Sequence, residues 1–460
     1  MQSSPRKSKK RKQKISIHQP WPLINPDAAG IDLGSREHWV AVPEDRDAQP
    51  VRSFGTFTAD LQSLILWLKA CRITTVAMEA TGVYWIAPFQ LLEQAGFKVA
   101  LVNARQIKNV SGRKSDVLDC QWIQRLHTYG LLGSSFRPAD PYCVLRSYLR
   151  YRDELVAARS TQTQHMQKAL AQMNLQLHHV LSDLNGESGL AIIAAILQGE
   201  RDPLKLAALA NRRVKAKRET IAKALVGDYR REHLFQLQSA YDLYQTYEQK
   251  IQQCDQQLLR ELEALPDQVD VQLKPLPPAS VAKQRLNAAT RLALYRKLGV
   301  DVTAIESVGP LVALTLLTEV GPDLSAFKTE KHFTSWLGLC PDNRISGGKV
   351  LSCRTRRVVN RLSDALRLAA TSLERSQTAL GAYYRRMKAK LGAAAGVTAT
   401  AHKLARLLYR LIKHGEAYVQ QGLLDYEKKL QKRKLYYLQQ TAQALGFNLV
   451  EKQQLPSPVS

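Results

Sequence analysis

The stretch Ala29-Gly30-Ile31-Asp32-Leu33-Gly34 places one carboxylate in the middle of an apolar run. Successive side chains of a strand point to opposite faces, so Ile31 and Leu33 share one face and Asp32 lies on the other. A carboxylate in a buried strand is costly unless a partner neutralises it, and a metal ion is a common partner. The stretch therefore predicts a strand that carries an acidic ligand. A second strand is predicted at Trp39–Val42, after a polar turn.

The residues that follow alternate between strand and helix patterns up to about residue 130. Helices are predicted from Thr58, which would cap the first one, then over 83–94 and 115–129. Strands are predicted at 29–34, 38–43, 53–57, 74–78 and 99–102. Five strands with interleaved helices indicate an α/β layer. Three strands followed by alternating helix and strand is the order that ribonuclease-H-like domains have.

The composition points to a polyanionic partner. The chain has 460 residues, enough for two or three domains, and its formal net charge is +26. Such a charge attracts nucleic acid, and an anionic membrane is the competing partner. No run of roughly 18 apolar residues and no basic amphipathic terminus supports a membrane. The six cysteines show no metal-ligand spacing, so we expect reduced thiols in a cytoplasmic protein.

Three further carboxylates are placed to complete a metal site with Asp32. Glu79 ends the fourth predicted strand, and Asp116 and Asp119 share one face of a predicted helix. Two Mg²⁺ ions roughly 3.5–4 Å apart are a common device for phosphodiester chemistry and need several oxygen ligands. The alternative for Asp116 and Asp119 is an ordinary solvated helix face. The cations just ahead of that pair could hold a nucleic-acid backbone, namely Lys108, Arg113 and Lys114.

The middle of the chain, about 141–264, is predicted to be mostly helical. Apolar residues from Leu145 to Val156 suit one helix face, which Arg152 interrupts, and a second helix is predicted over 239–264. These helices could pair within the chain or form intermolecular coiled-coil arms, and the pattern leaves both open. Between them lie short helices and a basic turn at 212–218. Prolines in 265–290 indicate a linker, and a Gly-containing turn then opens a helix over 311–320.

A serine near residue 350 stands among cations. Ser346 precedes Gly347 and Gly348, which is first of all the pattern of a hairpin turn. The alternative is a nucleophile whose target phosphate is neutralised by neighbouring cations. No histidine adjoins Ser346, and His332 has no visible orienting partner, so a hydrolase triad is not supported. The cations are Arg344, Lys349, Arg354, Arg356 and Arg357.

Several of these segments resemble one family. GIDLG, AMEATGVYW and NVSGRKSDVLDCQWI are similar to the acidic core of the DEDD transposases of bacterial insertion sequences, the insertion-sequence one-hundred-and-ten family. The resemblance continues through GLAIIAAILQGERDP and REHLFQL, and resumes at IESVGPLVALTLLTEVG and WLGLCPDNRISGGK. It covers most of residues 29–415.

The resemblance implies a mechanism. Asp32, Glu79, Asp116 and Asp119 would be the four acidic residues of a RuvC-like site that holds Mg²⁺, with Mn²⁺ as an alternative. Ser346 would be the catalytic serine, which bonds covalently to DNA during strand exchange. The family often has Gly where this chain runs Arg357-Val358-Val359-Asn360, so the turn after the serine differs.

The resemblance also implies partners and a domain layout. The partners would be donor and target DNA, a non-coding bridge RNA that guides the protein by base pairing, and further copies of the chain in a dimer or tetramer. No membrane is expected, and the protein would be cytoplasmic, and nucleoid-associated when bound to DNA. The expected layout is a disordered basic arm (1–20), a RuvC-like domain (21–138), a helical coiled-coil region (139–264), a linker (265–290), a C-terminal serine transposase domain (291–425) and a helical or disordered tail (426–460).

Two other functions remain open from the residues alone. Gly30–Gly34 also resembles the first phosphate-binding hairpin of actin-like phosphotransferases, although no later Gly-rich phosphate or adenosine segment is convincing. A non-catalytic nucleic-acid-binding protein would explain the charge and would leave the four carboxylates without a role.

Overall fold

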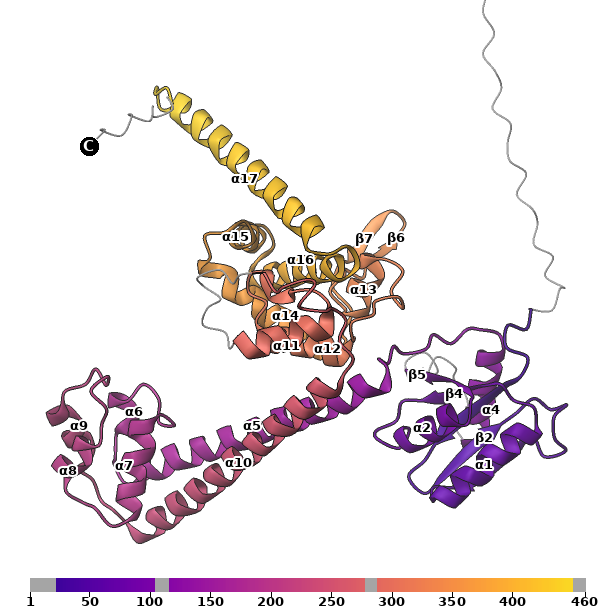
Figure 1. Cartoon of the computed structure of the whole chain (residues 1–460), viewed down its shortest axis with the longest axis horizontal. Coiled ribbons are helices and arrows are strands. Elements are labelled where there is room, and N and C mark those ends of the chain that lie inside the picture. Colours follow the sequence, from indigo (N-terminus) through magenta and orange to yellow (C-terminus); the bar gives the residue numbers. More distant parts are fainter. Residues whose placement is uncertain (1–21, 104–115, 278–287, 450–460) are drawn as a thin grey trace, which may run out of the picture. The chain divides into compact units, whose positions relative to one another are not determined.

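The computed structural model describes residues 22–103, 116–277 and 288–449, and the chain divides into two compact units, 1–136 and 137–460 (Figure 1). Among the described residues of the first unit, five strands form one mixed sheet in the order β3-β2-β1-β4-β5. β1 is antiparallel to β2 and parallel to β4. The strands are β1 (Ala28–Leu33), β2 (Glu37–Ala41), β3 (Val51–Gly55), β4 (Thr75–Glu79) and β5 (Lys98–Val102).

Helices cover both faces of this sheet. Two of them pack on one face around Ile31, Leu64 and Met78, and the third lies over the opposite face, where Ile123 contacts Ala77. The helices among the described residues of this unit are α1 (Thr58–Ala70), α2 (Ile86–Gln94) and α4 (Asp116–Thr128). The predicted α/β layer and its five strands are therefore confirmed.

Two predicted helix starts in this unit differ from the structure, the first by one residue and the second by three. Thr58 is the first residue of α1, and the cap is Phe57, whose backbone N–H bonds the Asp60 carboxylate. α2 begins at Ile86 and not at Val83, because the chain first turns at Gly82, where φ is +52°.

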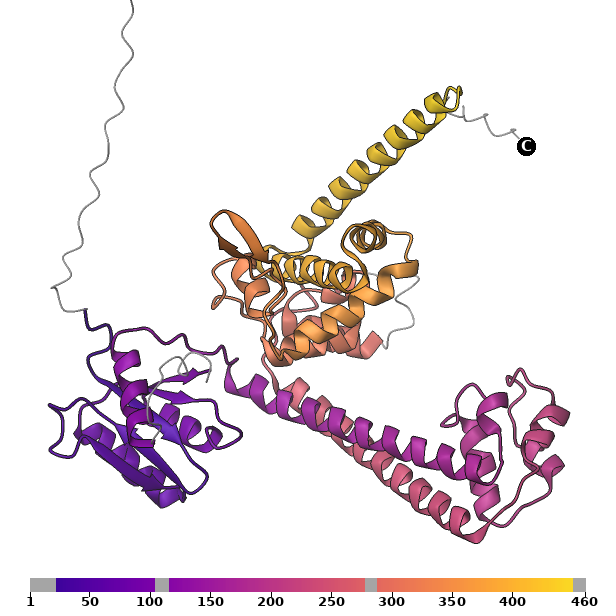
Figure 2. The same ribbon diagram turned by 180° about the vertical axis from the view of Figure 1, so that it is seen from behind.

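The second unit begins with two long helices that lie side by side (Figures 1 and 2). They are α5 (Asp140–Gln172) and α10 (Arg231–Ala264), and α10 starts eight residues before its predicted start at 239. Arg152 pairs with Asp255, and Arg159 pairs with Glu248 at 2.5 Å. Residue numbers rise along α5 as they fall along α10, so the helices are antiparallel. The predicted apolar face is buried, and the two helices pair within this chain. We call this pair the shaft.

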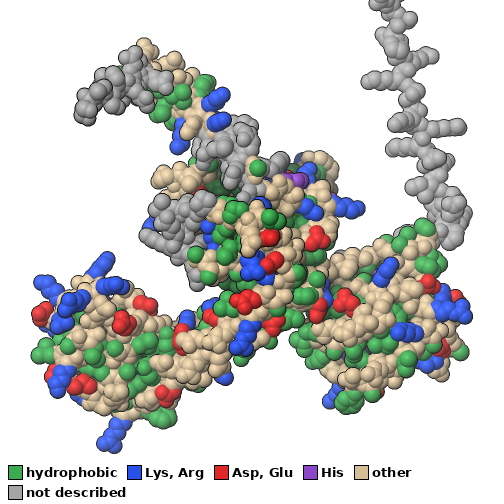
Figure 3. All heavy atoms as spheres, viewed as in Figure 1, with side chains coloured by type: hydrophobic (Ala, Val, Ile, Leu, Met, Phe, Trp, Pro, Cys, Tyr) green, Lys and Arg blue, Asp and Glu red, His purple; other side chains and the backbone are tan. Residues whose placement is uncertain are grey.

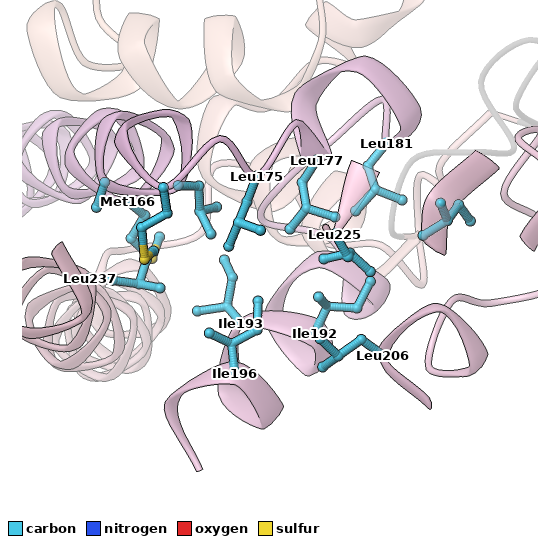
Figure 4. Packing of buried hydrophobic residues seen from close by; sticks show 14 of the residues in the cluster. Met166, Leu175, Leu177, Leu181, Ile192, Ile193, Ile196, Leu206, Leu225 and Leu237 are labelled. Atoms are coloured by element: carbon cyan, nitrogen blue, oxygen red, sulfur yellow. The ribbon is translucent and has the colours of Figure 1, made fainter. Parts of the chain in front are cut away.

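A small helical lobe closes the far end of the shaft. Its core contains Met166 from α5, Ile192 from α7 and Leu237 from α10 (Figure 4). The lobe helices are α6 (Leu177–Val180), α7 (Glu187–Leu197), α8 (Pro203–Ala208) and α9 (Arg218–Ala224). Because the core draws on both shaft helices, the lobe is fixed to the shaft by apolar packing.

Among its described residues, the regular structure in the remainder of the second unit is helical apart from one hairpin. Arg150 of α5 donates to Glu319 of α12 at 2.8 Å, and Lys297 donates to the carbonyl of Glu263 near the end of α10, so this part is tied to the shaft. The elements are α11 (Ala288–Leu298), η2 (Val302–Ala304), α12 (Pro310–Glu319), α13 (Glu330–Trp336), β6 (Arg344–Ser346), β7 (Lys349–Ser352), α14 (Arg361–Ser372), η3 (Leu373–Arg375), α15 (Ala379–Leu391), α16 (Ala393–His414) and α17 (Glu416–Ala444). Of the helices described, none is long and apolar enough to cross a membrane.

Candidate active site

The two faces of β1 meet different neighbours. Ala29, Ile31 and Leu33 belong to the apolar core beneath α1 and α2. Gly30 lies on the opposite face, where an added Cβ would be 2.3 Å from the backbone nitrogen of Gln124 and 2.4 Å from the carbonyl oxygen of Cys120. The backbone of α4 therefore presses directly on Gly30. Because strand side chains alternate, Asp32 faces the same side as Gly30 and lies half-buried on the α4 face.

Glu79 occupies the same face of the neighbouring strand. Within β4, Ala77 packs on α4, and Thr75 hydrogen-bonds His127 of α4 at 2.9 Å. Glu79 is two residues after Ala77, so it lies on the same face of β4 as Thr75 and Ala77. The parallel register pairs Ile31 with Met78, so Asp32 and Glu79 are the next residues on adjacent strands. Neighbouring strands are about 4.8 Å apart, which places the two carboxylates side by side at the carboxyl end of the sheet.

Helix α4 runs antiparallel to β1. Its last residues lie beside the segment that leads into β1, since the carbonyl of Thr128 accepts hydrogen bonds from the backbone N–H groups of Ile24 and Asn25, both at 2.9 Å. Its first residues therefore lie toward the carboxyl end of β1. Asp116 is the first residue of α4 and Asp119 is three residues on. The fold thus brings the end of α4 that bears both aspartates to the end of the sheet that bears Asp32 and Glu79.

The pKa of the Cys120 thiol is affected by carboxylates from both β1 and α4. Cys120 is fully buried between α4 and β1. Burial raises the pKa of its thiol to about 12, and the nearby carboxylates of Asp32 and Asp119 contribute to the increase. Two carboxylates from different elements therefore act on the same buried thiol. The side chain of Asp116 lies outside the described residues.

These residues suit a hard divalent cation. Asp32, Glu79 and Asp119 are half-buried, and neither Glu79 nor Asp119 forms an ion pair with a described residue. Carboxylates with no protein cation beside them favour a metal ion as counter-charge. Within the described residues, no three His, Cys, Asp or Glu side chains are already close enough to hold a metal. That statement does not include the fourth carboxylate, because the side chain of Asp116 is not among the described residues.

Trp39 lies beside Asp32, although the sequence did not predict it as a site residue. It is directly opposite Asp32 in the antiparallel β1–β2 pair, and residues opposite each other share a face. Its indole N–H is buried and has no acceptor among the described residues. The two-residue period of β2 is the sequence signal that could have identified it. The predicted backbone contacts Lys108, Arg113 and Lys114 lie outside the described residues.

Ser346 ends β6 at a two-residue hairpin turn. It pairs with Lys349 across the turn, and Gly347 and Gly348 have φ of +53° and +77°. A turn with positive φ at both central residues is the tight type that matches strand twist, and glycine adopts it without strain. The hairpin prediction is confirmed. Both glycines have open space around them, and the Ser346 hydroxyl is exposed, with no hydrogen-bond partner in the described part of the chain.

A lysine shares the serine face of the hairpin. Lys349 is opposite Ser346, so these two side chains point to one side. The register shifts between Arg344 and Ile345, and Arg344 lies 3.9 Å from the carboxylate of Asp342. Ile345 and Val350 occupy the other side and are more than half exposed. Of the remaining predicted cations, Arg354 and Arg357 are exposed after β7. The hairpin therefore presents one polar, cationic face and one apolar face to its surroundings.

Arg356 and His332, which lie near this hairpin in the sequence, each have a partner in the structure. Arg356 donates to the carbonyl of Ser335 at 2.7 Å, so it anchors the segment after β7 to the end of α13. His332 was predicted to have no orienting partner, but its Nδ1 is 2.8 Å from the hydroxyl of Thr329. A hydroxyl partner does not supply the carboxylate that a hydrolase triad requires.

Comparisons with known proteins place the chain in a class. A family model described as "Transposase" matches residues 29–175, which include all four carboxylates. A second model, described as "Transposase IS116/IS110/IS902 family", matches residues 301–385, which include Ser346. The chain belongs to the IS110 family of transposases, which is the insertion-sequence one-hundred-and-ten family.

One curated relative is similar to part of the chain. It is a protein of Sinorhizobium fredii named "Putative transposase y4pF/y4sB", 37% identical over 126 residues. The matched region is 25% of this chain and spans about a third (31%) of that relative's length.

Proposed function

We propose that this chain is a DNA transposase that cleaves and exchanges phosphodiester strands with two sets of groups. Asp32, Glu79, Asp116 and Asp119 would hold Mg²⁺, or Mn²⁺ in its place. Ser346 would be the nucleophile and would form a covalent DNA intermediate. The observation that carries the proposal is the convergence of Asp32, Glu79 and the aspartate end of α4 on one face of the sheet.

The acidic site would supply the charge that phosphodiester cleavage requires. When bound, Mg²⁺ stabilises negative charge on the phosphate oxygens and activates the attacking oxygen. The chain's own contribution is to fix the carboxylates. Asp32 and Glu79 are held by paired backbone strands, and Asp119 is held by a helix that packs without a gap on Gly30. Ligands on rigid elements keep their geometry more accurately than ligands on loops.

The hairpin would present Ser346 to the scissile phosphate. A bond forms between Ser346 Oγ and phosphorus as a deoxyribose oxygen leaves, and the hydroxyl proton is released. Lys349 shares the face of Ser346, Arg344 is two residues away in the same strand, and both would neutralise the phosphate oxygens. Gly347 and Gly348 have no side chains to keep the DNA backbone away. The serine ester conserves the phosphodiester linkage, so a second DNA end can displace the serine.

The proposed partners are donor DNA, target DNA and a non-coding bridge RNA, and the proposed assembly is a homo-oligomer of two or four chains. The protein would act in the cytoplasm and associate with the nucleoid when bound to DNA. The net charge of +26 supports a polyanionic partner. Guidance by RNA is tested by recovering and sequencing the nucleic acid that copurifies with the protein. A defined non-coding RNA is expected, and its absence from active protein would refute guidance.

The activity itself is tested with supercoiled plasmid, Mg²⁺ and RNA extracted from cells that express the protein. Nicked, linear or rearranged plasmid is the expected product, and chelation of Mg²⁺ should remove it. ATP turnover is measured in parallel. Turnover of ATP with unchanged plasmid would favour the actin-like phosphotransferase. Tight plasmid binding without cleavage under all conditions would favour the non-catalytic binding protein.

A further inference from the structure

A basic segment of the lobe has no role in the proposed chemistry. Five of the seven residues from 212 to 218 are Arg or Lys, and none is acidic. All five side chains are exposed, and none forms an ion pair with a described residue. Figure 3 shows Lys and Arg side chains on the outer surface of the lobe. We call this segment the basic tip; its cations are Arg212, Arg213, Lys215, Lys217 and Arg218.

Several cations of the shaft are paired with acids, although others, such as Lys168 and Lys250, are exposed. Along the shaft, Arg152 and Arg159 each pair with an acid of the facing helix. Near the base of the shaft, Arg146 and Arg150 both pair with Glu319. The first two pairs join the two shaft helices and the last two join the shaft to α12, and all four arginines have an acidic partner. The basic tip differs in density, because five exposed cations without an ion pair to a described residue lie within seven residues, and their combined charge can act on an external anion.

The backbone of the basic tip is fixed by the lobe. Val214 and Ala216 are half-buried against the lobe core, so apolar side chains alternate with the exposed cations. Upstream, the backbone N–H of Asn211 donates to Ser188 Oγ at 2.8 Å, and its side-chain oxygen accepts from the N–H of Arg213 at 3.0 Å. A merely solubilising charge run needs no such anchoring. A fixed backbone lowers the entropy that is lost when the side chains bind a ligand.

We infer that the basic tip is a contact site for the sugar-phosphate backbone of a nucleic-acid duplex. Closely spaced, unneutralised cations match a ligand that carries a regular series of negative charges. Contacts of this kind position a protein on a duplex and carry no sequence information, so the tip would add affinity and not site choice. That the anion is a nucleic acid, and not another polyanion, rests on the proposed function. The phosphodiester backbone is common to DNA and RNA, and the experiment separates them.

The test uses the full chain with Asp32→Asn, so that cleavage does not consume the probe. The tip variant adds Arg213→Gln, Lys215→Gln and Lys217→Gln and leaves Val214 and Ala216 intact. The matched control removes three exposed shaft cations instead, as Lys168→Gln, Lys250→Gln and Arg260→Gln. A third variant, Arg213→Lys with Lys215→Arg and Lys217→Arg, keeps the charge. Circular dichroism of each variant verifies that the helices are retained.

Binding to labelled DNA duplex and labelled RNA duplex is measured by fluorescence anisotropy between about 50 and 200 mM salt. Each lost phosphate contact lowers the slope of log K against log salt by about 0.9, so the tip variant should lose about 2 to 3 in slope and on the order of tenfold in affinity. The charge-conserving variant should keep both, and the shaft control should change little. The duplex that shows the larger loss identifies the ligand.

Four outcomes would overturn the inference. A tip variant that keeps the parental slope on both duplexes would remove the basic tip from binding, while the proposed function would stand. Equal losses in the tip and shaft variants would show a general charge effect. If the tip variant instead lost binding to phosphatidylserine vesicles and kept binding to both duplexes, the ligand would be a membrane. Failure of the parent chain to bind either duplex would contradict the proposed function as well.

Discussion

Gly30 of β1 and Cys120 of α4 are in direct backbone contact: a Cβ added to Gly30 would lie 2.4 Å from the Cys120 carbonyl oxygen. Real Cβ atoms do not approach an oxygen so closely, so only glycine allows α4 to lie this near the sheet. The same approach brings Asp119 toward Asp32. The contact between two residues 90 positions apart therefore determines the geometry of the acidic site.

Replacing Gly30 with alanine should force α4 away from the sheet, because overpacking a closed interface costs about 1–3 kcal/mol. Cys120 gives the readout. In the parent its thiol is buried, with a pKa raised to about 12, so it should resist iodoacetamide at neutral pH. Gly30→Ala should accelerate alkylation of Cys120, measured by peptide mass spectrometry. Gly309→Ala, at a site with open space around it, is the control. An unchanged Cys120 rate would show that the interface tolerates the methyl group.

Removing one acidic charge should stop Mg²⁺-dependent plasmid cleavage and leave nucleic-acid binding nearly unchanged. Asp32→Asn, Glu79→Gln and Asp119→Asn keep the shape of the side chain and weaken its bond to a metal. We expect cleavage rates to fall by at least about a hundredfold. Asp45→Asn removes an equal charge from an exposed position in the same unit and should leave the rate intact. Asp116→Asn is expected to behave like the first three variants. Parental activity in any of the four would exclude that residue from the site.

Glu330 should make the second unit sensitive to acid. Burial alone would raise its pKa, but hydrogen bonds from Arg410 and Arg406 outweigh burial and lower the pKa to about 2. A carboxylate with a depressed pKa stabilises the fold above its unfolded pKa of about 4.5, here by about 3 kcal/mol, and this contribution is lost as the pH falls toward 2. Glu330→Gln should therefore be less stable than the parent at pH 7, and the difference in urea midpoint should shrink between pH 5 and 2. A pH-independent difference would contradict this.

The shaft gives a test of pairing within the chain. Arg152→Asp or Asp255→Arg alone places like charges opposite each other, and both should loosen the shaft. The double exchange restores opposite charges and should recover about 0.5–1 kcal/mol, the usual size for a partly exposed pair. Hydrogen exchange of shaft amides measures the recovery. Strictly additive losses in the double variant would show that these residues do not face each other in solution.

The local patterns of the sequence predict much of this fold. The two-residue period around Asp32 identified β1, and the apolar spacing of Leu145 and Leu149 identified α5, because each signal lies within one element. In the sequence, Arg152 is a polar residue that interrupts that apolar face. The structure shows why the residue is polar: it pairs with Asp255, 103 positions away, and no local period contains that information.

The candidate site was predictable only in part, for the same reason. The acidic residue types and their places at strand and helix ends could be identified along the chain. The register that sets Asp32 beside Glu79 comes from the pairing of β1 with β4, and the close approach of α4 comes from its packing on Gly30; both are long-range contacts. The sequence did not predict Trp39 as a site residue, because its place in the site depends on which residue of β1 it faces. Helix starts were less accurate, since capping at Phe57 depends on the Asp60 side chain and not on Thr58.

The central claim is that Ser346 bonds covalently to DNA with the help of the acidic site. A serine hydroxyl is a poor nucleophile at neutral pH and needs a base or a metal, and no histidine adjoins Ser346 in the sequence. The adduct should therefore require both Ser346 and the four carboxylates. Ser352→Ala, in the partner strand of the same hairpin, is the matched control and should keep the adduct.

The most direct measurement is denaturing electrophoresis of the protein incubated with labelled DNA, Mg²⁺ and its copurifying RNA. The parent and Ser352→Ala should give a slow-migrating labelled band that protease removes. Ser346→Ala, Asp32→Asn and chelation of Mg²⁺ should each abolish the band. A Ser346→Ala protein that still produced the protease-sensitive band would contradict the account.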